Sequence, residues 1–187
     1  MNSLSSIKFL TLLALSAGLI AFASCNRDDD DDNTPENEQE VITTVTLTFV
    51  DQNNISTVFR ATDPDGDGGN PPVIDDVTLD ANATYRLFLG FLDESDPNDI
   101  EDITEEVEEE SNEHLVCFDG SGFTSLPQAQ DSDDNGDPLG VVSGLTTGIA
   151  GSGSLQVILR HKPDKSAAAP CTTGETDVDV TFPVTFQ

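Results

Sequence analysis

Two short acidic runs have the residue spacing of a calcium-binding loop. Both match the first half of the pattern Asp-x-Asp-x-Asp/Asn-Gly, in which alternate side-chain oxygens converge on one ion and glycine permits a sharp turn. The first run contains Asp63, Asp65 and Asp67, and the second contains Asp131, Asp133, Asn135 and Asp137. Neither has the glutamate that an EF-hand places at the twelfth position. We therefore expect weak Ca²⁺ sites in outer loops or, as the alternative, plain turns between strands that hold no ion.

The two histidines of the chain form a second candidate site. Glu110 and His114 lie four residues apart, so on a helix they share a face, which suits either an ion pair or a metal ion. His161 has the inward parity of its predicted strand. If the histidines meet beside Glu110 or Glu113, their nitrogen and carboxylate ligands predict a zinc-type site. The alternative is one exposed and one half-buried histidine with ordinary partners.

The N-terminal segment has the pattern of a secretory signal peptide over residues 1–24. Lys8 precedes an apolar run at residues 9–22, and two small residues come directly before Cys25. The run is shorter than the roughly 20 residues that span a bilayer, although an uncleaved anchor helix is the alternative. The ending Ala-Ser-Cys resembles the lipobox of bacterial lipoproteins. That resemblance implies that Cys25 is acylated and becomes the first residue of the mature chain.

The five aspartates after Asn26 and Arg27 resemble an export signal of gram-negative lipoproteins that reach the outer face of the outer membrane. This implies a lipid-anchored protein of the outer membrane, on the cell surface or otherwise facing the periplasm. Two or more acyl chains give stable attachment. We expect contact with the membrane through this anchor only.

The charge of the mature chain excludes several classes of partner. Loss of Lys8 with the signal peptide leaves 6 basic residues against 36 acidic ones, so the net charge is −30. Nucleic acids and anionic lipid surfaces both require a basic patch, which this chain cannot assemble. Divalent cations are the natural counter-ions.

Cys117 and Cys171 are the two cysteines that remain once Cys25 is assigned to lipid. An oxidising compartment favours a disulfide between them, and two buried or idle thiols are the alternative. Neither is expected to act as a nucleophile, because no basic surroundings exist to lower a thiol pKa.

The mature chain divides into an acidic disordered tether at residues 25–40 and a single domain at residues 41–187. Within the domain apolar residues alternate with polar ones at a period of two. Strands are predicted at 41–62 as a hairpin, 73–79, 84–92, 115–118, 123–126, 141–146, 155–160 and 178–186. A short acidic helix is predicted over residues 100–113, with a connecting loop as the alternative. The fold class is mainly β, an antiparallel immunoglobulin-like β-sandwich.

Three stretches of the domain resemble a family of small acidic lipoproteins of gram-negative bacteria. They are residues 102–110 leading to His114, residues 159–163, and residues 174–177 together with Thr181-Phe182-Pro183. Members often carry the label "type 1 periplasmic binding fold" and accompany TonB-dependent outer-membrane receptors, which implies a role in nutrient or metal uptake. The label denotes a longer α/β chain of two lobes, whereas the period of two predicts a β-sandwich here.

The sequence lacks G-x-S-x-G, H-E-x-x-H and a complete phosphate loop, so we expect neither an enzyme nor an organic cofactor. We expect a lipid-anchored binding or accessory module that captures a divalent cation, Ca²⁺ or Zn²⁺, in support of an outer-membrane receptor. The alternative is a structural or adhesion domain in which Ca²⁺ stiffens the loops.

Overall fold

The computed structural model describes residues 40–64 and 69–187. They form a β-sandwich with one short α-helix, so the predicted fold class is confirmed. Among the described residues, no helix combines the length and apolar character needed to cross a bilayer. Cys25, Asp65 and Asp67 lie outside the described residues, as do the signal peptide and all of the predicted tether before Glu40.

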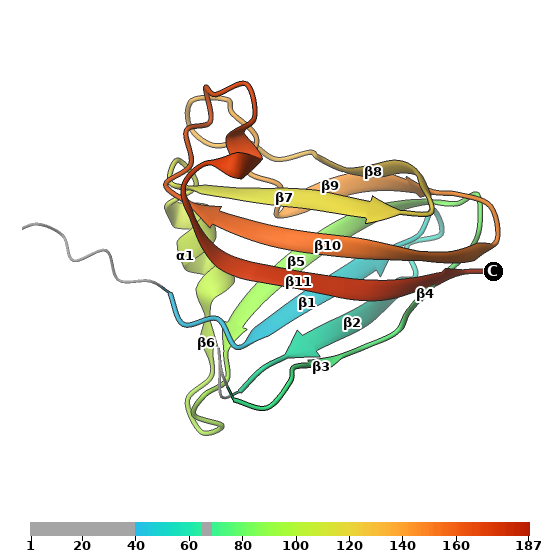
Figure 1. The fold of residues 1–187 in the computed structure, drawn as a ribbon, viewed down its shortest axis with the longest axis horizontal. Helices are drawn as coiled ribbons and strands as arrows, with labels where there is room; N and C mark the ends of the chain where they lie inside the picture. The colour runs from blue at the N-terminus through green and yellow to red at the C-terminus, as the bar shows by residue number, and fades with distance from the viewer. Residues whose placement is uncertain (1–39, 65–68) are drawn as a thin grey trace, which may run out of the picture. The chain divides into compact units, whose positions relative to one another are not determined.

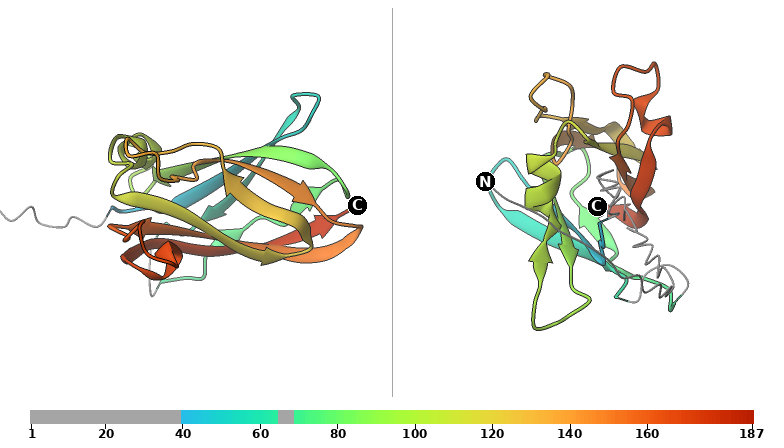
Figure 2. Two further views of the ribbon diagram at one scale, coloured as in Figure 1. Left: turned by 90° about the horizontal axis from the view of Figure 1, so that it is seen from above. Right: turned by 90° about the vertical axis from the view of Figure 1, so that its left-hand side faces the viewer.

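The sandwich consists of a seven-stranded sheet and a four-stranded sheet. In spatial order, the larger sheet contains β3 (Val73–Ile74), β2 (Ser56–Thr62), β1 (Thr44–Val50), β5 (Thr84–Asp93), β9 (Val142–Thr147) and β8 (Phe123–Ala129), with β6 (Glu101–Asp102) paired to β5. The smaller sheet contains β4 (Val77–Leu79), β11 (Glu175–Phe186), β10 (Gly151–His161) and β7 (His114–Ser121). Figure 1 and Figure 2 show the sheets as two layers, with β10 and β11 in one layer and β1, β2 and β5 in the other.

One strand pair departs from the antiparallel prediction. β4 runs parallel to the end of β11, where Val77 to Leu79 pair with Val184 to Phe186. The remaining strand pairs among the named strands are antiparallel. Before Val184, one side of β11 therefore has no partner strand within the described ranges.

The core lies between the two sheets and follows from the alternation in the sequence. Successive strand residues point to opposite faces, so every second residue of β1, β5, β10 and β11 faces inward. Fully buried examples are Leu47, Phe49, Leu87, Phe91, Leu155, Val157, Leu159 and Phe182. Burial of each such side chain stabilises the fold by about 1.5–3 kcal/mol relative to exposure.

The single α-helix, α1 (Ile103–Glu109), is shorter than the predicted range of 100–113. Asp102 caps its start by accepting a hydrogen bond from the Thr104 backbone N–H, and Ile103 and Val107 are buried. No basic residue stands in its last turn, so the glutamates there oppose the helix dipole, and the helix ends at Glu109 with Glu110 as its C-cap.

Several chain segments meet at one end of the sandwich. There α1, the start of β7, the end of β10 and the start of β11 all lie at the same end of the molecule (Figure 1). The short 3₁₀-helix η1 (Pro170–Thr172) is attached to β7 by a disulfide between Cys171 and Cys117, whose Cα atoms are 5.8 Å apart. This end carries both histidines.

Candidate metal centre

The two histidines stack on each other inside the sandwich. His114 is the first residue of β7, His161 is the last of β10, and they are register partners. Their ring centroids lie 4.9 Å apart, with 14° between the ring planes. The rings are buried, with 0% and 4% of the residues exposed. Strand parity, which predicts an inward His161, thus places it against His114, and neither histidine is exposed or half-buried.

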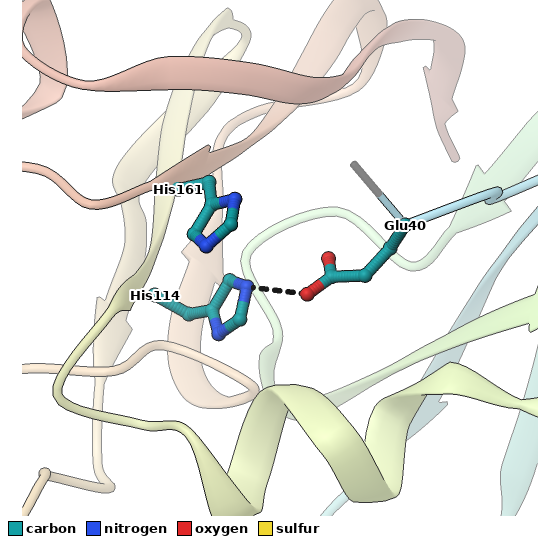
Figure 3. A group of neighbouring side chains, drawn as sticks. All are labelled: Glu40, His114 and His161. Atoms are coloured by element: carbon teal, nitrogen blue, oxygen red, sulfur yellow. Dashed lines mark ion pairs between the residues drawn. The ribbon is translucent and has the colours of Figure 1, made fainter. Parts of the chain in front are cut away.

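Glu40 supplies the carboxylate nearest to the pair. Its Oε1 lies 2.9 Å from His114 Nε2, and the Glu40 side chain is only 6% exposed. Figure 3 shows the Glu40 carboxylate pointing at the His114 ring. The contact is an ion pair without hydrogen-bond alignment, and Glu40 Oε2 is buried with no hydrogen-bond partner among the described residues.

The other ring nitrogen of His114 is tied to the backbone. His114 Nδ1 lies 3.3 Å from the Glu110 carbonyl oxygen, the distance of a weak hydrogen bond in which Nδ1–H donates. A histidine whose Nδ1–H donates to a backbone carbonyl presents Nε2 as its ligand atom. Glu110, predicted as a side-chain ligand, therefore acts on His114 through its carbonyl.

Opposing effects set the charge of His114. Burial disfavours the imidazolium, but the Glu40 carboxylate and the Glu110 carbonyl outweigh it and raise the pKa of His114 above its ordinary value. The raised pKa favours the protonated imidazolium of His114 beside the Glu40 carboxylate.

His161 has one engaged and one unengaged nitrogen. Its Nε2 lies 3.8 Å from Glu113 Oε2, and that carboxylate is also 3.4 Å from Lys162 Nζ. Its Nδ1 is buried and has no hydrogen-bond partner within the described part of the chain. Glu113, with a side chain 48% exposed, is a peripheral group rather than part of the buried centre.

Asp177 adds a second buried carboxylate. The register of β10 and β11 shifts here, because Leu159 pairs with Val178 while Arg160 pairs with Thr176. Asp177 is the additional residue of this β-bulge, a device that redirects a side chain. Both its carboxylate oxygens are buried without hydrogen-bond partners in the described ranges. Burial raises the pKa of Asp177, Glu40 raises it further, and the two histidines oppose the rise.

Ligand atoms of these residues form compact groups. One atom each from Glu40, His114 and His161 lie within 4.8 Å of one another, and the same holds for Glu110, Glu113 and His161. A third group consists of Glu40, Glu106 and Glu110. The structure therefore places His114 and His161 in one group with Glu40, which the sequence pattern does not predict, whereas the Glu110 side chain groups with Glu113 and His161 and not with His114.

The loop at residues 131–137 uses its carboxylates differently. Asp131 accepts backbone N–H bonds from Gly140 and Val142, both at 2.7 Å. Asp133 Oδ1 accepts from Asn135 and Asp137 at 2.9 Å, and its Oδ2 lies 3.0 Å from Lys165 Nζ. These contacts are those of a plain turn, and no group of metal ligands within the described residues comes from this loop. Calcium binding here stays a prediction.

The other acidic loop is described only at its start. Asp63 donates its backbone N–H to the Thr43 carbonyl at 2.7 Å, and its Oδ1 is buried with no hydrogen-bond partner among the described residues. Asp63 is thus positioned beside the segment that follows Glu40.

No protein-family model, curated protein or solved structure matches this chain.

Proposed function

We propose that this domain binds one divalent transition-metal ion, with Zn²⁺ as its representative, through His114, His161 and Glu40. The observation that carries the proposal is a set of two buried imidazoles and a buried carboxylate whose ligand atoms lie within 4.8 Å of one another. Nitrogen and carboxylate oxygen are standard ligands of Zn²⁺. Ca²⁺ instead takes six to eight oxygens, which does not suit a centre built on imidazole.

Metal binding would require a small local rearrangement. Ligands bind Zn²⁺ at about 2.0–2.1 Å in a tetrahedral array, so the three atoms must move closer together. The lone pair of an imidazole nitrogen lies in the ring plane, and the two rings are nearly parallel. One ring must therefore turn about its Cβ–Cγ bond to direct a nitrogen at the same ion. His161 is the candidate, because its Nδ1 has no described partner to lose.

The surrounding charge favours a cation at this position. Burial raises the pKa of Glu106, and Glu40 and Glu110 raise it further. The crowding of like charges that disfavours ionisation at Glu106 and Asp177 would be relieved by an ion of charge +2. Asp177 is suited to complete the coordination or to neutralise the bound ion from outside it.

In the cell envelope this site would serve a lipid-anchored accessory protein. With Cys25 acylated, the domain would be held at the outer membrane and would capture divalent cations beside an uptake receptor. The acidic surface, with a net charge of −29 for the full chain, attracts cations and repels polyanions. This role rests on the lipobox and on the family resemblance.

Calorimetric titration of the metal-free domain with Zn²⁺ tests the proposal. We expect one ion per chain, with affinity at least tenfold weaker in Glu40→Gln and in His161→Gln. Glu109→Gln is the matched control, because it removes the same charge from an exposed position at the end of α1 and should alter the affinity less than twofold.

Thermal unfolding gives an independent readout of the same site. At a free Zn²⁺ concentration 100 times the Kd, binding should stabilise the wild type by about 2.7 kcal/mol and His161→Gln by much less. The proposal is wrong if Zn²⁺ does not bind, or if the wild type and His161→Gln bind it equally well while both retain the circular dichroism of the fold.

A further inference from the structure

A groove runs beside the candidate metal centre along the open side of β11. Its volume is about 520 Å³, within the range of small-molecule sites. One wall is formed by β11 residues 176–180, and the other by the segment from Glu40 to Thr43 together with parts of β1 and β2. Val41, Ile42 and Val180 are among the apolar residues that line it.

Three carboxylates line the same groove and have unused acceptor atoms. Glu40 Oε2, Asp63 Oδ1 and both carboxylate oxygens of Asp177 are buried, without a hydrogen-bond partner among the described residues. A buried polar group without a partner costs about 1–3 kcal/mol, and more when it is charged. Each such group in a native structure calls for an explanation, and a bound ligand that donates to it is one.

Three basic side chains of the domain contact groups other than the unpartnered oxygens of the groove. Arg60, three residues before Asp63, donates to both carboxylate oxygens of Glu94 at 2.8 Å. Lys165 is held by Asp133 and two backbone carbonyls. Arg160 donates to the Thr176 hydroxyl, and the Asp177 oxygens accept from no described donor. The unpartnered oxygens of the groove thus accept from no described basic side chain, which favours a ligand that carries its own positive charge.

We propose that the groove binds a small organic cation, a primary alkylammonium. Its ammonium group brings a positive charge and N–H donors to the unpartnered carboxylate oxygens of the groove, and its alkyl chain lies against the apolar lining. Glu40 borders both sites: Oε1 faces His114, whereas Oε2 has no hydrogen-bond partner among the described residues. The groove adjoins the proposed metal centre but does not depend on an ion there.

Titration with hexylammonium in the presence of a chelator tests the proposal, with 1-hexanol and hexanoate as the neutral and anionic comparisons. We expect hexylammonium alone to bind. Asp177→Asn should weaken it at least tenfold, and Asp63→Asn at least threefold. Asp179→Asn is the matched control, because Asp179 also borders the groove but its carboxylate already accepts a 2.6 Å hydrogen bond from Gln156. Its effect should stay below twofold.

The result separates this site from the metal centre. His161→Gln should lose Zn²⁺ binding and keep hexylammonium affinity within twofold, whereas Asp63→Asn should keep Zn²⁺ affinity. The proposal is overturned if hexylammonium does not bind, if hexanol binds equally well, or if Asp177→Asn and Asp179→Asn have equal effects in folded protein.

Discussion

Two acidic regions of the domain differ in what their carboxylates contact. In the loop at residues 131–137, Asp131 and Asp133 accept hydrogen bonds from backbone N–H groups, and Asp133 also pairs with Lys165. Around the histidines, Glu40 and Asp177 keep buried oxygens that no described donor reaches. The carboxylates of the loop thus find their hydrogen-bond donors within the fold, whereas those of the histidine centre keep oxygens that a bound ion or ligand could contact. Acidic composition alone does not distinguish these cases, but the donors around each carboxylate do.

Removal of the disulfide should have the largest effect on stability, and it tests what holds Lys165 beside the loop at residues 131–137. Cys117 and Cys171, 54 residues apart in sequence, enclose the loop that carries Lys165. Replacing both with alanine should lower the free energy of unfolding by about 2–5 kcal/mol, measured by urea denaturation. In that background Asp133→Asn should cost less than in the wild type, because Lys165 is less firmly placed.

Wild-type protein unfolded under reducing conditions is the control and should match the double variant. A loss below about 1 kcal/mol, or fully additive effects of the disulfide and Asp133, would show that the loop is held independently of this link.

The same substitution in the two regions should have opposite signs. Asp177→Asn removes a buried charge that has no described partner, so it should raise the free energy of unfolding by about 1 kcal/mol in metal-free protein. Asp133→Asn replaces an acceptor oxygen that meets only donors, so it should lower stability. Urea denaturation at pH 7.5 with chelator measures both. Equal signs would remove the distinction between the regions.

The smallest effect is a pH dependence at Asp133. Burial opposes its ionisation, but hydrogen bonds from Lys165, Asp137 and Asn135 outweigh burial and lower the pKa of Asp133. A carboxyl with a lowered folded-state pKa stabilises the protein above its unfolded pKa of about 3.9, and this is lost as pH falls through the folded value. The stability difference between wild type and Asp133→Asn should therefore shrink below pH 4. A difference that grows on acidification would contradict this assignment.

Much of the fold follows from local pattern in the sequence. The period of two places Leu155, Val157 and Leu159 inward on β10 and carries His161 inward with them. The helix is recognisable from Ile103 and Val107, four residues apart. Its end is less predictable, because the glutamates that continue the helical pattern also oppose the dipole. The parallel contact of β4 with β11 joins short segments far apart in sequence, which no local pattern encodes.

The candidate site is predictable only in part, for two physical reasons. His161 follows from strand parity. His114 is indicated by residue type and by its helical spacing from Glu110, yet it lies at the start of β7 and not on the helix. Glu40 lies at the end of the predicted tether, where its sequence neighbours give no sign of burial. Asp177 has the parity of an outward residue, and only the bulge after Thr176 turns it inward. The Asp/Gly signature at residues 131–137 is strong in sequence, yet a turn and an ion site use the same residues.

The open side of β11 has a consequence for self-association. An unpaired strand edge is a template on which a second copy of the chain could add a strand and begin a polymer. Here the exposed residues Glu175 and Asp179 place negative charge on this strand, and Pro183 lacks the N–H that a ladder would need. A second copy approaching this edge would meet like charge and a missing N–H donor, and both disfavour the addition of a strand beside the groove.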